Sequence, residues 1–258
     1  MATYFFDTNI LIQFGRDPAT RSQLEVAVQQ GALFVVAPPT ITELVRGVAA
    51  NGGKTFLSNR EVFVWLNANR FTILELPLPF IACQMRTRPV RKSGVRPTHY
   101  VALIEMLAGA DDFDDFISRT EAPGSIWKGL RNLHRIHEGQ LDTEIGALPA
   151  VAARGGDVAT AMSQMFGAPG CRPSALLLRR RFSAALEFLE CSCRKVNAGA
   201  NPRKNDPGIY FDFQLLFYLG SDGLSFLTDE NFGHEIRNSP QRRRIVRIDS
   251  LQLNPHLR

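Results

Sequence analysis

Short apolar segments that end at an acidic residue occur near both ends of this 258-residue chain. Residues 3–6 run into Asp7, and residues 224–227 are followed by Thr228 and Asp229. A carboxylate just past a short buried strand lies at the rim of a parallel sheet, where open α/β folds place their ligands. The pattern therefore predicts an α/β fold in which two distant parts of the chain meet at one edge of a sheet.

The order of the other expected elements agrees with an α/β fold. A helix that begins near Thr8 or Asn9, either of which can cap it, follows the first strand. Pro77 and Pro79 are expected to close the third strand. We expect strands at 3–6, 32–37, 71–76, 224–227 and 244–249, and helices at 8–15, 18–30, 39–50, 54–69, 209–220 and 231–237.

The middle of the chain has a different character, because helix formers dominate and strand-like runs are rare. We expect helices at about 99–119, 125–147, 157–166 and 173–196. The sequence thus predicts two parts: residues 1–79 with 205–258 as an α/β domain, and residues 80–204 as a helical insertion or subdomain.

Composition is typical of a soluble globular protein, with 45% hydrophobic and 21% charged residues. The formal net charge of +5 permits a polyanionic partner and equally fits ordinary surface charge. Asp7 interrupts the first apolar run, so we expect no signal peptide. No apolar stretch reaches the ~20 residues of a membrane helix. We therefore expect a cytoplasmic protein without membrane association and with free cysteine thiols.

Four acidic residues are expected to converge on one edge of the sheet: Asp7, Glu43, Asp212 and Asp229. Two carboxylates about 4 Å apart repel by about 4 kcal/mol at an effective dielectric of ~20, so such a cluster calls for a cation or for protonation. Oxygen donors without His or Cys favour Mg²⁺ or Mn²⁺ over zinc. A divalent ion held in this way suits the activation of water and the hydrolysis of a phosphodiester.

The motifs around these acids resemble those of the PIN-domain family. Asp7–Ile12 is similar to the first family motif, and Glu43 within Thr40–Leu44 to the second. Asp212–Leu219 resembles the third, and Leu227–Phe232 the fourth. The resemblance implies a PIN-like sandwich of helices around a parallel sheet and metal-dependent endonuclease activity on RNA, less often on DNA. Many members are toxins of toxin–antitoxin pairs, so the resemblance implies an antitoxin protein as a candidate partner.

Two features depart from the family pattern. Glu43 and Asp212 are 169 positions apart, whereas the family usually has a few dozen residues between these acids. The last motif often has one residue between its Thr and its acid, which makes Glu230 a rival to Asp229. Asp206 is a rival to Asp212, although Pro207-Gly208 favour a turn at that point.

Several polar and basic residues are candidates for contact with a nucleic acid. Thr8, Asn9 and Thr228 could position a phosphate or a water molecule, or could satisfy local backbone donors. Arg203 and Lys204 are the best basic candidates, because they come shortly before Asp212. Further basic segments lie at residues 88–96 and 242–247, and a solvated surface is the alternative for all three.

Two other functions stay open on sequence grounds. The first is a catalytically weak PIN-like scaffold that docks a protein or nucleic acid through its helical block. The second is a phosphatase or a receiver-like domain, which also has an acid after its first strand. A phosphatase would need a second Asp at position 9, where this chain has Asn9. The sequence leaves the oligomeric state open.

Overall fold

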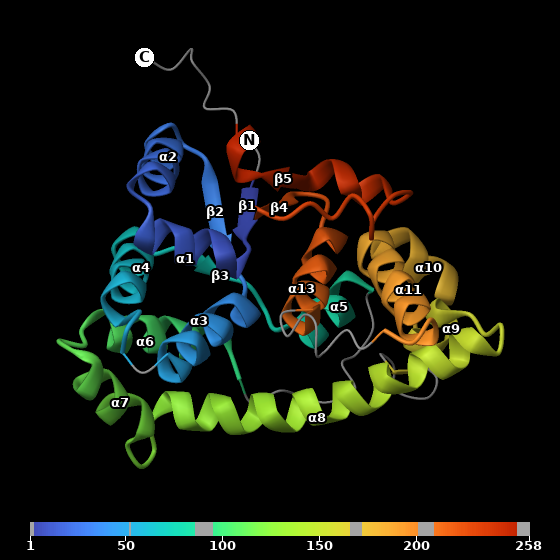
Figure 1. Ribbon diagram of the computed structural model, residues 1–258, viewed down its shortest axis with the longest axis horizontal. Coiled ribbons are helices and arrows are strands. Elements are labelled where there is room, and N and C mark those ends of the chain that lie inside the picture. The colour runs from blue at the N-terminus through green and yellow to red at the C-terminus, as the bar shows by residue number, and fades with distance from the viewer. Residues whose placement is uncertain (1–2, 52, 86–94, 166–171, 201–208, 252–258) are drawn as a thin grey trace.

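A five-stranded parallel sheet forms the centre of the molecule (Figure 1). The computed structural model describes residues 3–51, 53–85, 95–165, 172–200 and 209–251. The strands are β1 (Thr3–Phe6), β2 (Leu33–Val36), β3 (Thr72–Ile73), β4 (Leu224–Thr228) and β5 (Ile245–Arg247). They lie in the order β3-β2-β1-β4-β5, and helices cover both faces. The predicted mixed α/β fold is confirmed.

The strand order reverses direction at the middle of the sheet. After β1 the chain continues to β2 and β3 on one side, and it returns much later to β4 and β5 on the other. Phe6 at the end of β1 pairs with Leu227 of β4, so the two strands end at the same level. In open α/β sheets, the crevice beyond the strand ends at such a switch point is where ligands bind.

Alternating side chains divide the strands between two hydrophobic cores. Phe6, Val36 and Leu227 belong to the first core, whereas their neighbours Phe5 and Phe226 belong to the second. The first core is covered by α1 (Thr8–Arg16), α2 (Pro18–Gln29), α3 (Pro38–Ala50), α4 (Phe56–Asn69), α6 (Pro97–Ala108) and α7 (Phe113–Glu121).

The second core is covered mainly by helices from the middle and the end of the chain. These are α5 (Pro77–Gln84), α9 (Val158–Met165), α10 (Ala175–Arg181), α11 (Ser183–Asn197), α13 (Ile209–Leu216) and the 3-10 helix η1 (Phe217–Gly220). Phe5 stacks on Phe226 with ring centroids 5.0 Å apart, which joins the centre of the sheet to this core. Tyr218 of η1 is fully buried there, and its hydroxyl donates to the Glu75 carbonyl at 2.6 Å.

The long helix α8 (Ile126–Ala153) runs along the base of the molecule in Figure 1 and reaches both cores. Trp127 and Leu130 near its start belong to the first core, and Leu148 near its end belongs to the second. Its 28 residues span about 42 Å at ~1.5 Å per residue. The division into residues 80–204 and the rest stays a prediction; in the structure, helices of this segment pack in the same cores as the sheet.

Several predicted boundaries were wrong. The expected helix at 99–119 is two helices, because Asp112 caps α7 by accepting from the Asp115 N–H at 2.8 Å. The expected helix at 173–196 is likewise divided at Phe182 into α10 and α11. Residues 209–220 form α13 followed by η1, and β3 is shorter than residues 71–76.

Three further expectations differ from the structure. Residues 231–237 form turns instead of a helix, and the Asn231 side chain accepts from the Gly233 N–H at 3.0 Å. Pro77 and Pro79 lie in the first turn of α5, where a missing N–H costs little, so they open a helix that was not predicted. Asp7, instead of Thr8 or Asn9, is the cap of α1.

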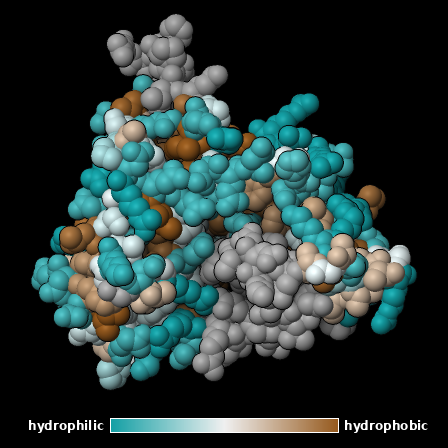
Figure 2. All heavy atoms as spheres, viewed as in Figure 1, coloured by the Kyte–Doolittle hydropathy of each residue, from teal (hydrophilic) through white to brown (hydrophobic). Residues whose placement is uncertain are grey.

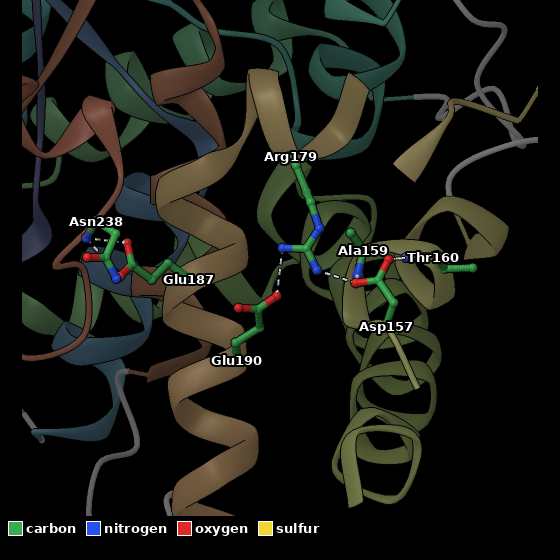
Figure 3. A network of polar contacts seen from close by, with 7 residues as sticks. All are labelled: Asp157, Ala159, Thr160, Arg179, Glu187, Glu190 and Asn238. Atoms are coloured by element: carbon green, nitrogen blue, oxygen red, sulfur yellow. Dashed lines mark hydrogen bonds and ion pairs between the residues drawn. The ribbon is translucent and has the colours of Figure 1, made fainter. Parts of the chain in front are cut away.

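A polar network fastens α11 to its neighbours (Figure 3). Arg179 of α10 lies between Glu190 of α11 and Asp157 at the start of α9 and pairs with both. Glu187 of α11 accepts from the backbone N–H of Asn238 at 2.9 Å and also from those of Arg237 and Ser239. These bonds hold the segment that leads from β4 to β5 against the helical layer.

The surface in view is largely hydrophilic, with hydrophobic residues scattered over it (Figure 2). The exposed large hydrophobic residues come from different elements: Leu33, Leu57, Val64, Val101, Leu176, Leu177 and Val196. Within the described part of the chain, none of the helices combines the length and the apolar character needed to cross a membrane.

Candidate functional site

Asp7 lies at the end of β1 and is almost completely buried, with 3% of its surface exposed. Its backbone N–H donates to the Leu227 carbonyl at 2.8 Å, which extends the β1–β4 pairing by one residue. Its side chain caps α1 by accepting from the Asn9 N–H at 3.3 Å, and its other oxygen accepts from the Thr228 hydroxyl at 2.6 Å. The carboxylate is thus fixed between the ends of β1 and β4.

Burial raises the pKa of Asp7 from 3.8 to about 6, because desolvation disfavours the charged form. Hydrogen bonds from Thr228 and from the Asn9 N–H act in the opposite direction and stabilise the carboxylate. The negative charge of Asp229 also contributes to the raised pKa of Asp7, so the two acids interact electrostatically. Asp7 is therefore a carboxyl whose ionisation is costly unless a positive charge lies nearby.

Glu43 reaches the same region from the helix that follows β2, the strand beside β1. It lies in α3, and its carboxylate accepts from the Thr8 hydroxyl at 2.5 Å. Thr40 in the first turn of α3 donates to the Phe6 carbonyl at 3.0 Å, which fastens the start of that helix to the end of β1. Two local contacts therefore bring Glu43 beside the residue that follows Asp7.

Asp229 comes directly after β4 and is half-buried. Gln13 of α1 donates to its Oδ2 at 2.6 Å. Its other oxygen, Oδ1, is buried and has no hydrogen-bond partner among the described residues. A buried acceptor without a partner is uncommon, and such atoms often accompany an ion or a water molecule.

Glu230 has a different environment from its neighbour. Its side chain is exposed and accepts from the Asn9 side chain at 3.3 Å, and its backbone N–H donates to the Thr228 hydroxyl at 3.0 Å. Asp229 is thus half-buried beside α1, whereas Glu230 is exposed. Thr228 acts as a link, because its hydroxyl accepts from the Glu230 N–H and donates to Asp7.

Asp212 lies in the first turn of α13 and is buried, with 8% of its surface exposed. Its helix packs against α3, which carries Glu43, and also against α11. The helices that carry Asp212 and Glu43 therefore pack against each other, although the two residues are 169 positions apart in the sequence (Figure 1). The rival Asp206 and the predicted substrate-binding Arg203 and Lys204 lie outside the described residues.

Residues 88–94 of the other basic segments also lie outside the described part. In the C-terminal basic segment, the arginine side chains have different environments. Arg244 turns inward and donates to the carbonyl oxygens of Leu219, Ser221 and Leu224, so it supports the fold. Arg247 is exposed, lies opposite Thr228 in the β4–β5 register and pairs with Asp249. Arg242 and Arg243 are also exposed.

The structure thus connects side chains from three stretches of the chain near the carboxyl ends of β1 and β4, whereas Asp212 is related to them only through the packing of α13 on α3. Asp7 contacts Thr228, Thr8 contacts Glu43, and Gln13 contacts Asp229. Among the described residues, no group of three or more His, Cys, Asp or Glu side chains is arranged to hold a metal ion. The donors nevertheless fit Mg²⁺ or Mn²⁺ in kind, because they are hard oxygens and one buried oxygen lacks a partner.

Two contributors were missed in the sequence. Gln13 lies one helical turn after Asn9, so its position on the same face of α1 was a signal that could have been used. Thr40 lies three residues before Glu43, and its contact with the Phe6 carbonyl depends on the fold. No signal in the sequence around Thr40 points to that carbonyl.

Comparison with known proteins adds no family to these observations. No protein family, curated protein or solved structure that was compared with this chain matches it.

Proposed function

We propose that this protein is a PIN-like, Mg²⁺- or Mn²⁺-dependent endonuclease that hydrolyses phosphodiester bonds, with RNA as the substrate. The observation that carries the proposal is the placement of Asp7 and Asp229. They follow β1 and β4 at the point where the strand order reverses, and they interact electrostatically. This is the position at which open α/β sheets bind ligands. In addition, Asp229 Oδ1 is buried and has no hydrogen-bond partner among the residues that the structure describes.

Each acid has a distinct part in the proposed site. Asp7 and Asp229 hold the cation from β1 and β4, while Glu43 and Asp212 complete the set from α3 and α13. A divalent ion at such a site activates water and neutralises charge on a phosphodiester. The fixed carboxylates provide the charge that attracts the cation, and Thr228 keeps Asp7 oriented through its 2.6 Å hydrogen bond.

Thr8 and Asn9 lie at the start of α1, beside the acids. Thr8 is tied to Glu43 and Asn9 is tied to Glu230, so both amino-terminal residues brace acids that come from other segments. Asn9 is exposed, which leaves it accessible to a substrate. An antitoxin partner and a phosphate-binding role for Arg203 and Lys204 stay predictions.

Cleavage of an end-labelled single-stranded RNA in Mg²⁺, in Mn²⁺ and in chelator tests the proposal. The wild type should cleave only with metal. Asp7→Asn and Asp229→Asn should each lose at least about 100-fold in rate, since each removes charge from the cation site. Glu230→Gln is the matched control next in sequence to Asp229, and it should retain activity. Full cleavage by Asp7→Asn or by Asp229→Asn would overturn the assignment.

A thermal-shift titration separates the nuclease from a catalytically weak scaffold. A four-acid site should be stabilised by millimolar Mg²⁺ or Mn²⁺ by RT ln(1 + [L]/Kd). Asp7→Asn should lose that stabilisation. A wild type that responds to neither cation and cleaves nothing would support the scaffold instead.

A further inference from the structure

We infer that Gln13 is a positioning residue that holds Asp229 by one oxygen and presents the other oxygen to a divalent cation. The inference rests on the proposed function, because it assigns a role within the same site. It adds a residue that belongs to none of the four motifs and fixes which carboxylate atom receives the ligand.

The contact is specific in its geometry. Gln13 Nε2 donates to Asp229 Oδ2 at 2.6 Å, across 216 positions of sequence. A carboxylate only accepts, so the amide nitrogen of Gln13 must face it. Gln13 is held in turn by α1, whose residues Ile10, Leu11 and Phe14 are buried in the first core.

The two oxygens of Asp229 therefore differ. Oδ2 is occupied by Gln13, whereas Oδ1 is buried and has no partner among the described residues. A buried carboxylate oxygen without a donor is unfavourable, and a bound cation would offset that cost. Groups that hold metal-ligating carboxylates by hydrogen bonds orient them, and their loss typically weakens metal affinity by about 10–100-fold.

Gln23 supplies a matched control. It lies on α2, is half-buried like Gln13, and also makes one long-range bond through its side-chain amide, to the Ile248 carbonyl at 2.7 Å. Gln13→Leu and Gln23→Leu thus each remove one long-range bond donated by a side-chain amide, but only Gln13 donates to an acid of the proposed site. A general loss of packing would affect both variants alike.

The test is the affinity for Mn²⁺, measured by calorimetry on the full chain for the wild type, Asp7→Asn, Gln13→Leu and Gln23→Leu. Gln13→Leu should bind Mn²⁺ at least about 10-fold more weakly than the wild type, and Gln23→Leu should match the wild type. With RNA, the KM of Gln13→Leu should stay unchanged, while its loss of kcat should diminish as Mg²⁺ is raised. If Gln13→Leu does not fold, Gln13→Met, which keeps the side-chain length and lacks the donor, takes its place.

The outcomes separate this inference from the proposed function. If the wild type binds Mn²⁺ and Asp7→Asn does not, but Gln13→Leu keeps wild-type affinity, Gln13 has no positioning role and the nuclease proposal stands. An equal loss in Gln23→Leu would also overturn the inference. If the wild type itself binds no Mn²⁺, the proposed function fails and the inference fails with it.

Discussion

Removing the charge of Asp7 should stabilise the protein in the absence of metal. Asp7→Asn keeps the shape of the side chain and an oxygen that can accept from the Asn9 N–H. It removes a buried negative charge whose pKa is raised to about 6 by desolvation and by the neighbouring charge of Asp229. The substitution is expected to destroy the proposed activity while it strengthens the fold.

The magnitude follows from the pKa of Asp7. The folded-state pKa lies above the unfolded one, so the folded state binds the proton more tightly, and stability falls as pH rises from below 3.8 to above about 6. At ~1.4 kcal/mol for each pKa unit, the charge costs about 3 kcal/mol near pH 8 and roughly half of that near pH 5. Asp7→Asn should recover these amounts.

Urea unfolding of both proteins with chelator present, at about pH 8 and about pH 5, measures the two gains. A gain of about 3 kcal/mol corresponds to a rise in Tm of roughly 6–12 °C for a chain of this size. Millimolar Mn²⁺ should stabilise the wild type and leave Asp7→Asn unchanged. A lower stability of Asp7→Asn than of the wild type near pH 8, or an equal gain at both pH values, would refute a destabilising charge on Asp7.

Three further substitutions test separate parts of the structure. Thr228→Val removes the hydrogen bond that lowers the pKa of Asp7, so that pKa should rise further in an NMR titration, and the protein should lose about 1–3 kcal/mol near neutral pH. Gly220→Ala should cost about 1–3 kcal/mol in urea unfolding, since its Cβ would lie 2.2 Å from the Phe182 ring; wild-type stability would contradict the packing of η1 on the helical layer. Gly129→Ala, with open space around its Cβ in α8, should instead stabilise the helix by about 0.5–1 kcal/mol in the same assay, and a loss there would show that α8 is packed differently.

Local signals explain why the sequence predicts the sheet and the two acidic residues that follow its strands β1 and β4. Each strand carries a short apolar run, and Asp7 and Asp229 follow β1 and β4 directly. Parallel strands end at one edge, so the fold class places these two residues at the same edge, and the adjacency of β1 and β4 in the sheet brings them close together. Thr228 was a weaker prediction, because a threonine at a strand end can as easily satisfy its own backbone.

Long-range packing explains what the sequence did not reveal. The contact of Gln13 with Asp229 and the packing of α13 on α3 join segments that are distant in the chain, and neither leaves a local pattern. Two predicted helices were divided: one at Asp112, whose side chain caps α7, and one at Phe182, which makes no side-chain cap bond. At 231–237 the chain forms turns, although Asn231 accepts from the Gly233 N–H in the same way as Asp7 caps α1, so this local signal alone does not produce a helix.

We propose that carboxylates at the carboxyl ends of β1 and β4 share one divalent cation. Anomalous diffraction from crystals soaked in Mn²⁺ tests it most directly, because the signal locates the ion without reference to activity. We expect a peak between Asp7 and Asp229, with Asp229 Oδ1 at about 2.0–2.6 Å from the ion. Strong peaks elsewhere, with none between these two carboxylates, would contradict it.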